Sequence, residues 1–190
     1  MKWLKRILLL ILALALFLLC VILPVGGSWL ITNRVGSFRE RGPRMPQDVG
    51  LETENIEFTS PDGVRLLGWW DSGDSSQPII IFAHGLNRSR LEMLERAGEA
   101  RKRGYSVLLF DLRNHGESGR AYTTLGINES LDVCAASRFL DQRGIHRPKM
   151  LWGVSMGAST ALLALKKCGG FNGVISDSAF LDRKSTRLNS

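Results

Sequence analysis

Between residues 51 and 181, short runs of apolar residues alternate with longer stretches in which apolar positions recur every three or four residues. Continuous short runs are typical of strands buried on both faces of a parallel sheet, and the longer period is typical of helices. The pattern predicts six strands, at 55–59, 64–70, 78–83, 105–110, 149–153 and 173–176. It predicts three helices, at 91–103, 128–143 and 157–167.

The order of these elements indicates a fold class. Residues 60–63 read Ser-Pro-Asp-Gly, a turn sequence, so the first two strands should form a hairpin. From residue 78 onward, strands and helices alternate, which predicts an α/β fold with a doubly wound, mostly parallel sheet. The carboxyl ends of parallel strands share one rim, where such sheets bind ligands. Four polar residues follow strands directly and should lie on that rim: His84, Asp111, Ser155 and Asp177.

The N-terminus carries an apolar run of a different kind. Residues 7–23 contain no charged or strongly polar side chain, and three cations precede them within residues 2–6. A membrane-spanning helix needs about 20 apolar residues, which the run reaches if it continues past an interruption at 24–28 to Ile31. We expect residues 1–31 to form an uncleaved signal anchor, a transmembrane helix; a cleaved signal peptide, cut near the interruption, is the alternative.

The flanks of this run bear on orientation. Residues 32–50 are rich in Arg, Gly and Pro, and we expect them to form a basic juxtamembrane linker. The cations at 2–6 favour a cytoplasmic N-terminus, whereas four arginines within 34–44 oppose it from farther away. We therefore expect a single-pass membrane protein with its folded domain outside the cytoplasm.

The net charge of +7 does not indicate a nucleic-acid partner. Residues 51–181 contain fifteen Lys or Arg and fifteen Asp or Glu, so the excess positive charge lies in residues 1–50 and 182–190. Because the expected domain is neutral, the basic net charge is no argument for nucleic-acid binding.

The three cysteines show neither metal-ligand spacing nor an even-numbered disulfide framework. Cys20 lies in the apolar leader, and Cys134 and Cys168 lie in predicted helices. We expect the latter two to be small, half-buried thiols, which leaves the redox compartment open.

Residues 153–157 read Gly-Val-Ser-Met-Gly and lie between a predicted strand and a predicted helix. In this context a Gly-x-Ser-x-Gly sequence predicts a strained turn that holds the serine hydroxyl clear of the sheet. Gly153 and Gly157 would let the strand and the helix cross closely. Ser155 is therefore the candidate nucleophile.

With three further motifs, this pentapeptide resembles the α/β-hydrolase superfamily, in particular membrane-anchored bacterial hydrolases of the serine aminopeptidase-like or monoacylglycerol-lipase-like branch. The further motifs are His84-Gly85, Asp111-Leu112-Arg113-Asn114-His115-Gly116-Glu117-Ser118 and Ile175-Ser176-Asp177-Ser178. The resemblance covers residues 51–181. Relatives usually have glycine where this chain has Asn114, a residue type that also tolerates left-handed backbone.

The resemblance implies a serine hydrolase that cleaves an ester, a thioester or a small amide or peptide through an acyl-enzyme on Ser155. It implies an oxyanion hole formed by the backbone N–H groups of Leu86 and Met156. The implied partners are a small acyl or peptide substrate and the membrane, with neither a cofactor nor a metal. Six residues are expected to support the motifs: His84, Gly85, Asp111, His115, Gly153 and Gly157.

The catalytic acid and base are less well defined. In this fold the chain order is serine, acid, histidine, so His84 and His115 are expected to be structural. His146 precedes a strand and should lie on the opposite rim. Asp177 is a candidate acid, with hydrogen bonding in its own loop as the alternative.

No histidine follows His146, although the resemblance implies two more strands that bring an acid and a histidine. Residues 182–190 resemble a translated sequencing adapter; a natural polar tail is the alternative. We therefore expect residues 51–181 to be the N-terminal part of a hydrolase domain, inactive without the remainder. The alternative function is a catalytically dead binding or signalling module of this fold at the membrane.

Overall fold

A computed structural model describes residues 2–33 and 45–180 of the chain. Most of the predicted linker, residues 34–44, and the whole predicted non-native tail, residues 182–190, lie outside the described residues. The contacts divide the chain into two units, residues 1–35 and 36–190, which are described separately.

The first unit is helical throughout its described length. It comprises α1 (Lys2–Phe17), a π-helical turn η1 (Leu18–Ile22) and α2 (Leu23–Asn33). The predicted interruption at 24–28 does not end the helix. Pro24 lacks an N–H, and its ring would clash with the carbonyl four residues earlier in a regular helix. The turn before it is widened, with the Leu23 N–H bonded to the Leu18 oxygen, five residues back.

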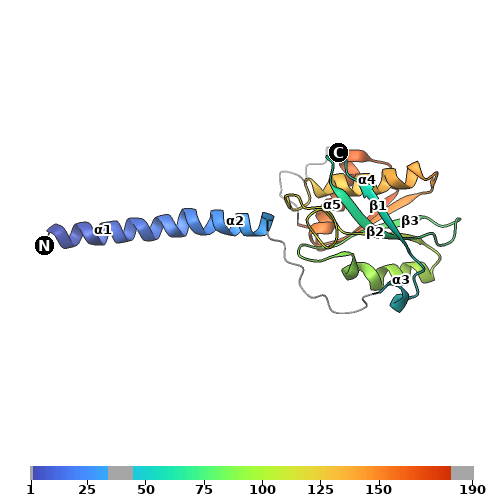
Figure 1. Cartoon of the computed structure of the whole chain (residues 1–190), viewed down its shortest axis with the longest axis horizontal. Coiled ribbons are helices and arrows are strands. Elements are labelled where there is room, and N and C mark those ends of the chain that lie inside the picture. Colours follow the sequence, from blue (N-terminus) through green and yellow to red (C-terminus); the bar gives the residue numbers. More distant parts are fainter. Residues whose placement is uncertain (1, 34–44, 181–190) are drawn as a thin grey trace. The chain divides into compact units, whose positions relative to one another are not determined.

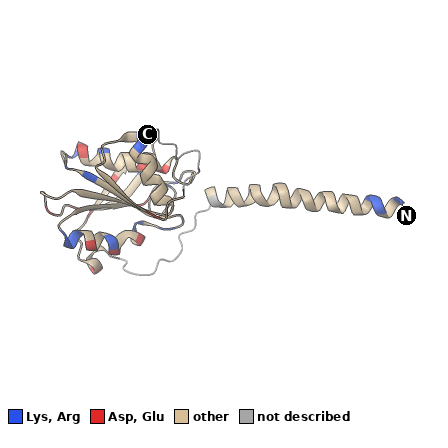
Figure 2. Cartoon of the chain, turned by 180° about the vertical axis from the view of Figure 1, so that it is seen from behind, with Lys and Arg blue, Asp and Glu red and all other residues tan. Residues whose placement is uncertain are grey.

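The charge distribution of this helix is one-sided. Lys and Arg occur only near its N-terminal end, and the remainder carries no charged side chain (Figure 2). The segment Lys2–Leu30 is long and apolar enough to cross a membrane, a criterion that a signal sequence or the core helix of a soluble protein also meets. No side chain of α1 is buried.

The second unit is built on one six-stranded sheet with the strand order β1-β2-β4-β3-β5-β6. Figure 1 labels the first three strands of the chain, β1, β2 and β3. The strands are β1 (Glu54–Thr59), β2 (Arg65–Asp71), β3 (Ile79–Ala83), β4 (Ser106–Phe110), β5 (Lys149–Val154) and β6 (Gly173–Asp177). β1 and β2 form the predicted hairpin, β2 pairs antiparallel with β4, and the other pairings are parallel. The predicted α/β fold with a mostly parallel sheet is confirmed.

Helices cover both faces of this sheet. They are η2 (Pro46–Val49), η3 (Arg90–Met93), α3 (Leu94–Lys102), α4 (Glu129–Gln142) and α5 (Met156–Cys168). α3 packs on one face, and α4 and α5 pack on the other (Figure 1). The chain passes from β3 to β4 on one side and later returns to β5 on the other side of β3. The carboxyl ends of β3 and β5 therefore flank the topological switch point, where doubly wound sheets place their ligand crevice.

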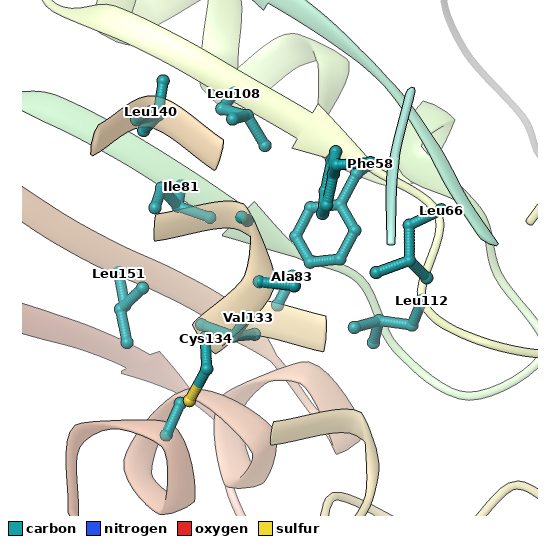
Figure 3. Packing of buried hydrophobic residues seen from close by; sticks show 14 of the residues in the cluster. Phe58, Leu66, Ile81, Ala83, Leu108, Leu112, Val133, Cys134, Leu140 and Leu151 are labelled. Carbon is teal, nitrogen blue, oxygen red and sulfur yellow. The ribbon is translucent and has the colours of Figure 1, made fainter. Parts of the chain in front are cut away.

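The core consists of two apolar layers. Along β3, Ile79, Ile81 and Ala83 face α4 and α5, whereas Ile80 and Phe82 face α3, as the two-residue period of a strand requires. The larger layer, on the side of α4 and α5, joins Ile79, Ile81 and Ala83 to Phe58, Leu108, Val133 and Leu151. Figure 3 shows part of this layer. β6 forms one edge of the sheet, and its Ile175 is 38% exposed.

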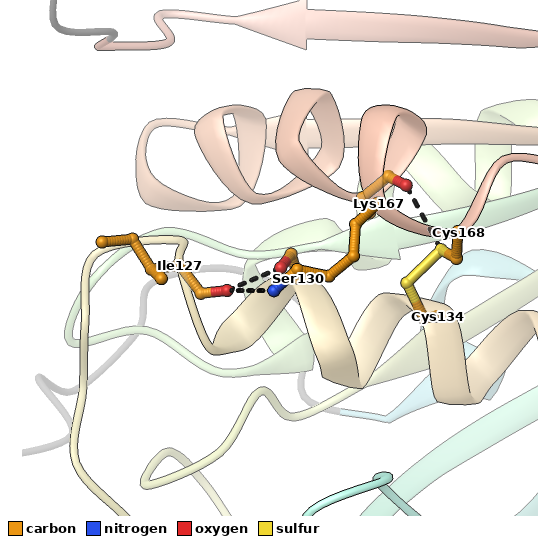
Figure 4. The surroundings of a disulfide bond; sticks show 6 residues. Ile127, Ser130, Cys134, Lys167 and Cys168 are labelled. Atoms are coloured by element: carbon orange, nitrogen blue, oxygen red, sulfur yellow. Dashed lines mark hydrogen bonds between the residues drawn. A yellow bond between two sulfur atoms is a disulfide. The ribbon is translucent and has the colours of Figure 1, made fainter. Parts of the chain in front are cut away.

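The prediction that Cys134 and Cys168 are free, half-buried thiols is wrong. Cys134 of α4 and Cys168, the last residue of α5, form a disulfide with their Cα atoms 5.9 Å apart (Figure 4). The two residues are separated by 34 positions in the sequence, and only the packing of α4 against α5 brings them together. The disulfide therefore ties the far end of α5 to the neighbouring helix.

Candidate active site

Ser155 lies on the turn between β5 and α5, with φ 52° and ψ −116°. A residue with a side chain is strained at positive φ, at a cost of roughly 1–3 kcal/mol. The Ser155 N–H donates to the backbone carbonyl oxygen of Asp177 at 2.8 Å. The Ser155 carbonyl accepts from the N–H groups of Ala158 and Ser159 at 3.0 and 3.2 Å. The turn is thus held on both sides, and the strand–turn–helix context predicted for Ser155 is present.

Two glycines make this turn sterically feasible. A Cβ atom on Gly153 would lie 2.2 Å from the Gly157 oxygen, and one on Gly157 would lie 2.1 Å from the Ala83 oxygen. Both obstacles are backbone atoms in packed elements and cannot move aside. The first turn of α5 therefore packs directly against the end of β3.

His84 follows β3 and is completely buried. Its Nε2 accepts a hydrogen bond from the Leu112 N–H at 3.0 Å, so the ring proton is on Nδ1, which lies 2.8 Å from the Gly85 oxygen. Burial, reinforced by neighbouring His115, lowers the pKa of His84 to about 3. His84 is therefore neutral, and both of its ring nitrogens are used to hold the loops together.

His115 is in a similar position, with its ring centroid 5.1 Å from that of His84. Its Nδ1 lies 2.8 Å from the Arg113 oxygen, and burial lowers its pKa. Its Nε2 is buried and has no hydrogen-bond partner among the described residues.

The loop after β3 also carries the N–H group of Leu86, a predicted oxyanion donor. This N–H belongs to the same peptide unit as the Gly85 oxygen, so the bond from His84 orients it. Met156, the other predicted donor, is the first residue of α5, where N–H groups have no acceptor within the helix. Outside the helix and sheet ladders of the described chain, neither N–H donates a hydrogen bond.

One carboxylate at this loop was missed by the sequence analysis. The Gly85 N–H donates to Glu92 Oε2 at 2.7 Å. A Cβ atom on Gly85 would lie 3.3 Å from this oxygen and 3.6 Å from the Ser155 Cβ, so Glu92 and Ser155 flank the same glycine. No motif marks Glu92, because an acidic residue at the start of a helix is common for other reasons.

Asp111 organises the loop after β4. Its buried carboxylate accepts from the backbone N–H groups of Arg90 and Glu117 at 2.7 and 2.9 Å, and burial raises its pKa. Gly116, at φ 48°, leaves no room for a Cβ, which would lie 2.1 Å from an Asp111 oxygen. Asn114 has φ 62°, the left-handed backbone expected where relatives have glycine.

A buried ion pair, also not predicted, anchors this loop. Arg113 is 2% exposed, and its guanidinium lies 2.7 Å from Asp132 of α4 and 2.6 Å from Asp62 of the β1–β2 turn. Burial raises the pKa of Asp132 to about 6, whereas hydrogen bonding to Arg113 lowers that of Asp62 to about 2. Arg113 thus joins three segments that are distant in the sequence.

The remaining candidates are less closely engaged. The Asp177 carboxylate lies 3.4 Å from Arg96 and 3.0 Å from the Ser178 hydroxyl, and it contacts no histidine among the described residues. His146 precedes β5, at the opposite rim from Ser155, with a side chain that is 70% exposed. Within the described residues, no cluster of His, Cys, Asp or Glu could hold a metal ion.

The sheet order, the serine turn between β5 and α5 and the loops at its rim define the α/β-hydrolase fold, with solved hydrolases as structural neighbours. Residues 74–188 match the family described as serine aminopeptidase, S33, and the chain belongs to this family.

Individual relatives are named as a thiohydrolase, a polyketide transferase and an esterase. The chain is 37% identical over 112 residues to thiohydrolase aneE of Aspergillus aculeatus, covering 56% of this chain and 35% of the relative. It is 32% identical over 119 residues to polyketide transferase ATR5 of Stachybotrys chlorohalonatus, covering 60% of this chain and 40% of the relative. The structure of the Pyrococcus furiosus esterase Pf2001 superposes with a TM-score of 0.67 at 35% identity, covering 76% of this chain and 56% of the esterase. The chain thus spans well under two thirds of each relative.

Proposed function

We propose that the full-length protein is a serine hydrolase that cleaves an ester, a thioester or a small amide through an acyl-enzyme on Ser155. The observation that carries the proposal is the left-handed backbone of Ser155 on a turn closed by two glycines. Strained conformations of this kind cluster at active sites, because the surrounding structure must enforce them. The family assignment supports the same chemistry.

In the proposed mechanism, Ser155 Oγ attacks the substrate carbonyl carbon while a general base takes the hydroxyl proton. The negative charge that develops on the carbonyl oxygen is stabilised by the N–H groups of Leu86 and Met156. The tetrahedral intermediate collapses, and the leaving alcohol, thiol or amine receives the proton from the base. Water then attacks the acyl-enzyme by the same route and releases the acid and the free serine.

The base is proposed to come from the part of the full-length protein that this chain does not include. His84 and His115 are neutral and hold loops, and His146 is at the far rim. The curated relatives extend well beyond the matched region. The acid is proposed to come from the same part, with Asp177, bonded through its carbonyl to Ser155, as the alternative.

The substrate is proposed only as a class. The names of the thiohydrolase, the polyketide transferase and the esterase support a thioester or an ester, whereas the family description supports a peptide. Esters, thioesters and peptides all offer an acyl carbonyl carbon as the electrophile for the proposed nucleophile.

A fluorophosphonate probe tests the proposed nucleophile on the full-length protein. Wild type and a Ser75→Ala control, altered at an exposed loop serine, should both be labelled, and Ser155→Ala should not. Equal labelling of all three would refute the assignment of Ser155. A folded wild type that is not labelled at all would support a catalytically dead binding module instead.

We also propose that Lys2–Leu30 anchors the protein in a membrane, with the folded domain on the oxidising side. Trp3 and Trp29 are both exposed and stand about 39 Å apart along a helix that rises 1.5 Å per residue. Tryptophans favour both interfaces of a bilayer, which is about 40–45 Å thick with its headgroups. The Cys134–Cys168 disulfide supports a location of the folded domain on the oxidising side of the membrane, since disulfides persist mainly in oxidising compartments.

Thiol trapping in intact bacterial cells checks this orientation. In a Cys20→Ser variant, peptides containing Cys134 and Cys168 should resist a maleimide after acid quenching and should react only after reduction. Labelling of both without reductant would place the domain in the cytoplasm. A mature N-terminus beyond residue 26 would establish the cleaved signal peptide instead.

A further inference from the structure

The peptide groups on either side of Gly85 are both held by side chains, but by different ones. On its carbonyl side, the His84 ring bonds the Gly85 oxygen. On its amide side, the Gly85 N–H donates to Glu92 Oε2 at 2.7 Å. The next residue is Leu86, whose N–H is the proposed oxyanion donor. Glycine lacks a side chain that would restrict its backbone, so the loop is oriented by these two bonds together with a bond from the Arg88 N–H to the Gly85 oxygen at 3.3 Å.

Glu92 is well placed to act as a rigid support. It belongs to η3, which is capped by Ser89, whose hydroxyl accepts from the Leu91 N–H at 3.3 Å. Met93 and Leu94, which follow it, are fully buried in the core. The carboxylate therefore projects from an anchored backbone, and Arg88 Nε lies 3.7 Å from its other oxygen.

The bond from Gly85 to Glu92 is also short. The Gly85 nitrogen and Glu92 Oε2 lie only 2.7 Å apart, and any acceptor oxygen at this position, from a carboxylate or an amide, can hold the N–H there. Oxyanion donors must lie about 2.7–3.1 Å from the oxygen on which the charge develops, so the groups that position them matter as much as the donors themselves.

We propose that Glu92 is a positioning residue for the oxyanion hole: its carboxylate holds the Gly85 N–H and thereby sets the direction of the Leu86 N–H beside Ser155. This inference rests on the proposed serine-hydrolase function. Glu92 acts by the reach of its oxygen, since its negative charge alone would oppose the developing oxyanion.

Two substitutions in the full-length protein distinguish the effect of where the Glu92 oxygen lies from the effect of its negative charge. Glu92→Gln keeps an acceptor oxygen at the same distance but removes the charge. Glu92→Asp keeps the charge but withdraws the carboxylate by one methylene. Glu95→Ala, at an exposed acidic residue on α3, is the control.

We expect Glu92→Asp to lower kcat for a p-nitrophenyl ester by roughly 10–100-fold with little change in KM, somewhat less than the loss of a whole oxyanion donor. The affinity for a trifluoromethyl ketone, which forms an oxyanion in the same hole, should fall in parallel. Glu92→Gln should stay within about threefold of wild type, because its amide oxygen reproduces the acceptor. Each variant is also checked by thermal melting.

Three results would overturn the positioning role, and a fourth would refute the proposed function. Full activity in Glu92→Asp would overturn the positioning role, and so would a Glu92→Gln variant that melts like wild type but is as impaired as Glu92→Asp. A rise in KM without loss of kcat would indicate a substrate contact instead and would also overturn it. An inactive, unlabelled wild type would refute the proposed function itself, which distinguishes the two failures.

Discussion

On the Ser155 side of the candidate site, position is set by close backbone packing, whereas on the side of loops 84–92 and 111–119 it is set by buried polar side chains. At the serine turn, Gly153 and Gly157 bring α5 against β3, and the disulfide holds the other end of α5. In the two loops, backbone N–H groups are held by side chains such as His84, Glu92 and Asp111.

This difference makes the two sides sensitive to different changes. Among the described residues, the hydrogen bonds and close contacts given above for the serine turn join backbone atoms, so the turn should respond more to added volume than to pH. The loops depend on buried charges and on a neutral histidine, so they should respond to lost charge and to acid. Three substitutions in the full-length protein, followed by urea unfolding, test this contrast.

The largest effect is expected at the buried ion pair of the loops. Arg113→Met should lower the free energy of unfolding by about 3–5 kcal/mol, because it leaves Asp132 buried without a countercharge. Adding Asp132→Leu should restore most of the loss. The control is Arg65→Met, which breaks an exposed pair with Glu57 and should cost at most about 1 kcal/mol. Equal losses in Arg113→Met and Arg65→Met would show that the loops do not depend on this pair.

An intermediate effect is expected at the serine turn. Gly157→Ala should cost about 1–3 kcal/mol, since its Cβ would meet the backbone of β3 and the elements must shift apart. The control is Gly173→Ala, whose Cβ would lie 3.3 Å from the end of the Met150 side chain, which can move. If both variants unfold alike, close backbone packing is not what positions Ser155.

The smallest effect, per pH unit, is expected from His84. Its pKa is about 3 when folded and near 6.5 when unfolded, so the unfolded chain binds more protons between these values. Stability from neutral His84 is complete above pH 6.5 and is lost as the pH falls toward 3, by at most about 1.4 kcal/mol per pH unit.

His84→Asn removes this titration and keeps an N–H donor. The stability difference between wild type and His84→Asn should therefore shrink with falling pH, and comparing the two cancels the opposing contribution of Asp132, whose pKa burial raises. His146→Asn, at an exposed ring, should leave the pH profile unchanged. Parallel profiles for wild type and His84→Asn would contradict the buried neutral imidazole.

The same contrast explains what could be predicted from the sequence. The serine turn is specified by five adjacent residues between a strand and a helix pattern, so its geometry could be predicted locally, as could the left-handed Asn114. The loop supports depend on partners far apart in the chain. The bond between Arg113 and Asp132 spans 19 residues, and the disulfide spans 34. The sequence around each of these four residues gives no local sign of its partner. Only the packing of α4, which carries Asp132 and Cys134, brings the two pairs together.

The central claim, an acyl-enzyme on Ser155, is tested most directly by trapping the intermediate. Full-length protein is mixed with excess p-nitrophenyl ester, quenched in acid within the first turnover, digested and analysed by mass spectrometry. We expect a nitrophenolate burst stoichiometric with enzyme and an acyl adduct on Ser155 in the peptide that contains residues 153–157. Steady turnover with no acyl group on that peptide, or with the adduct on another residue, would contradict the central claim.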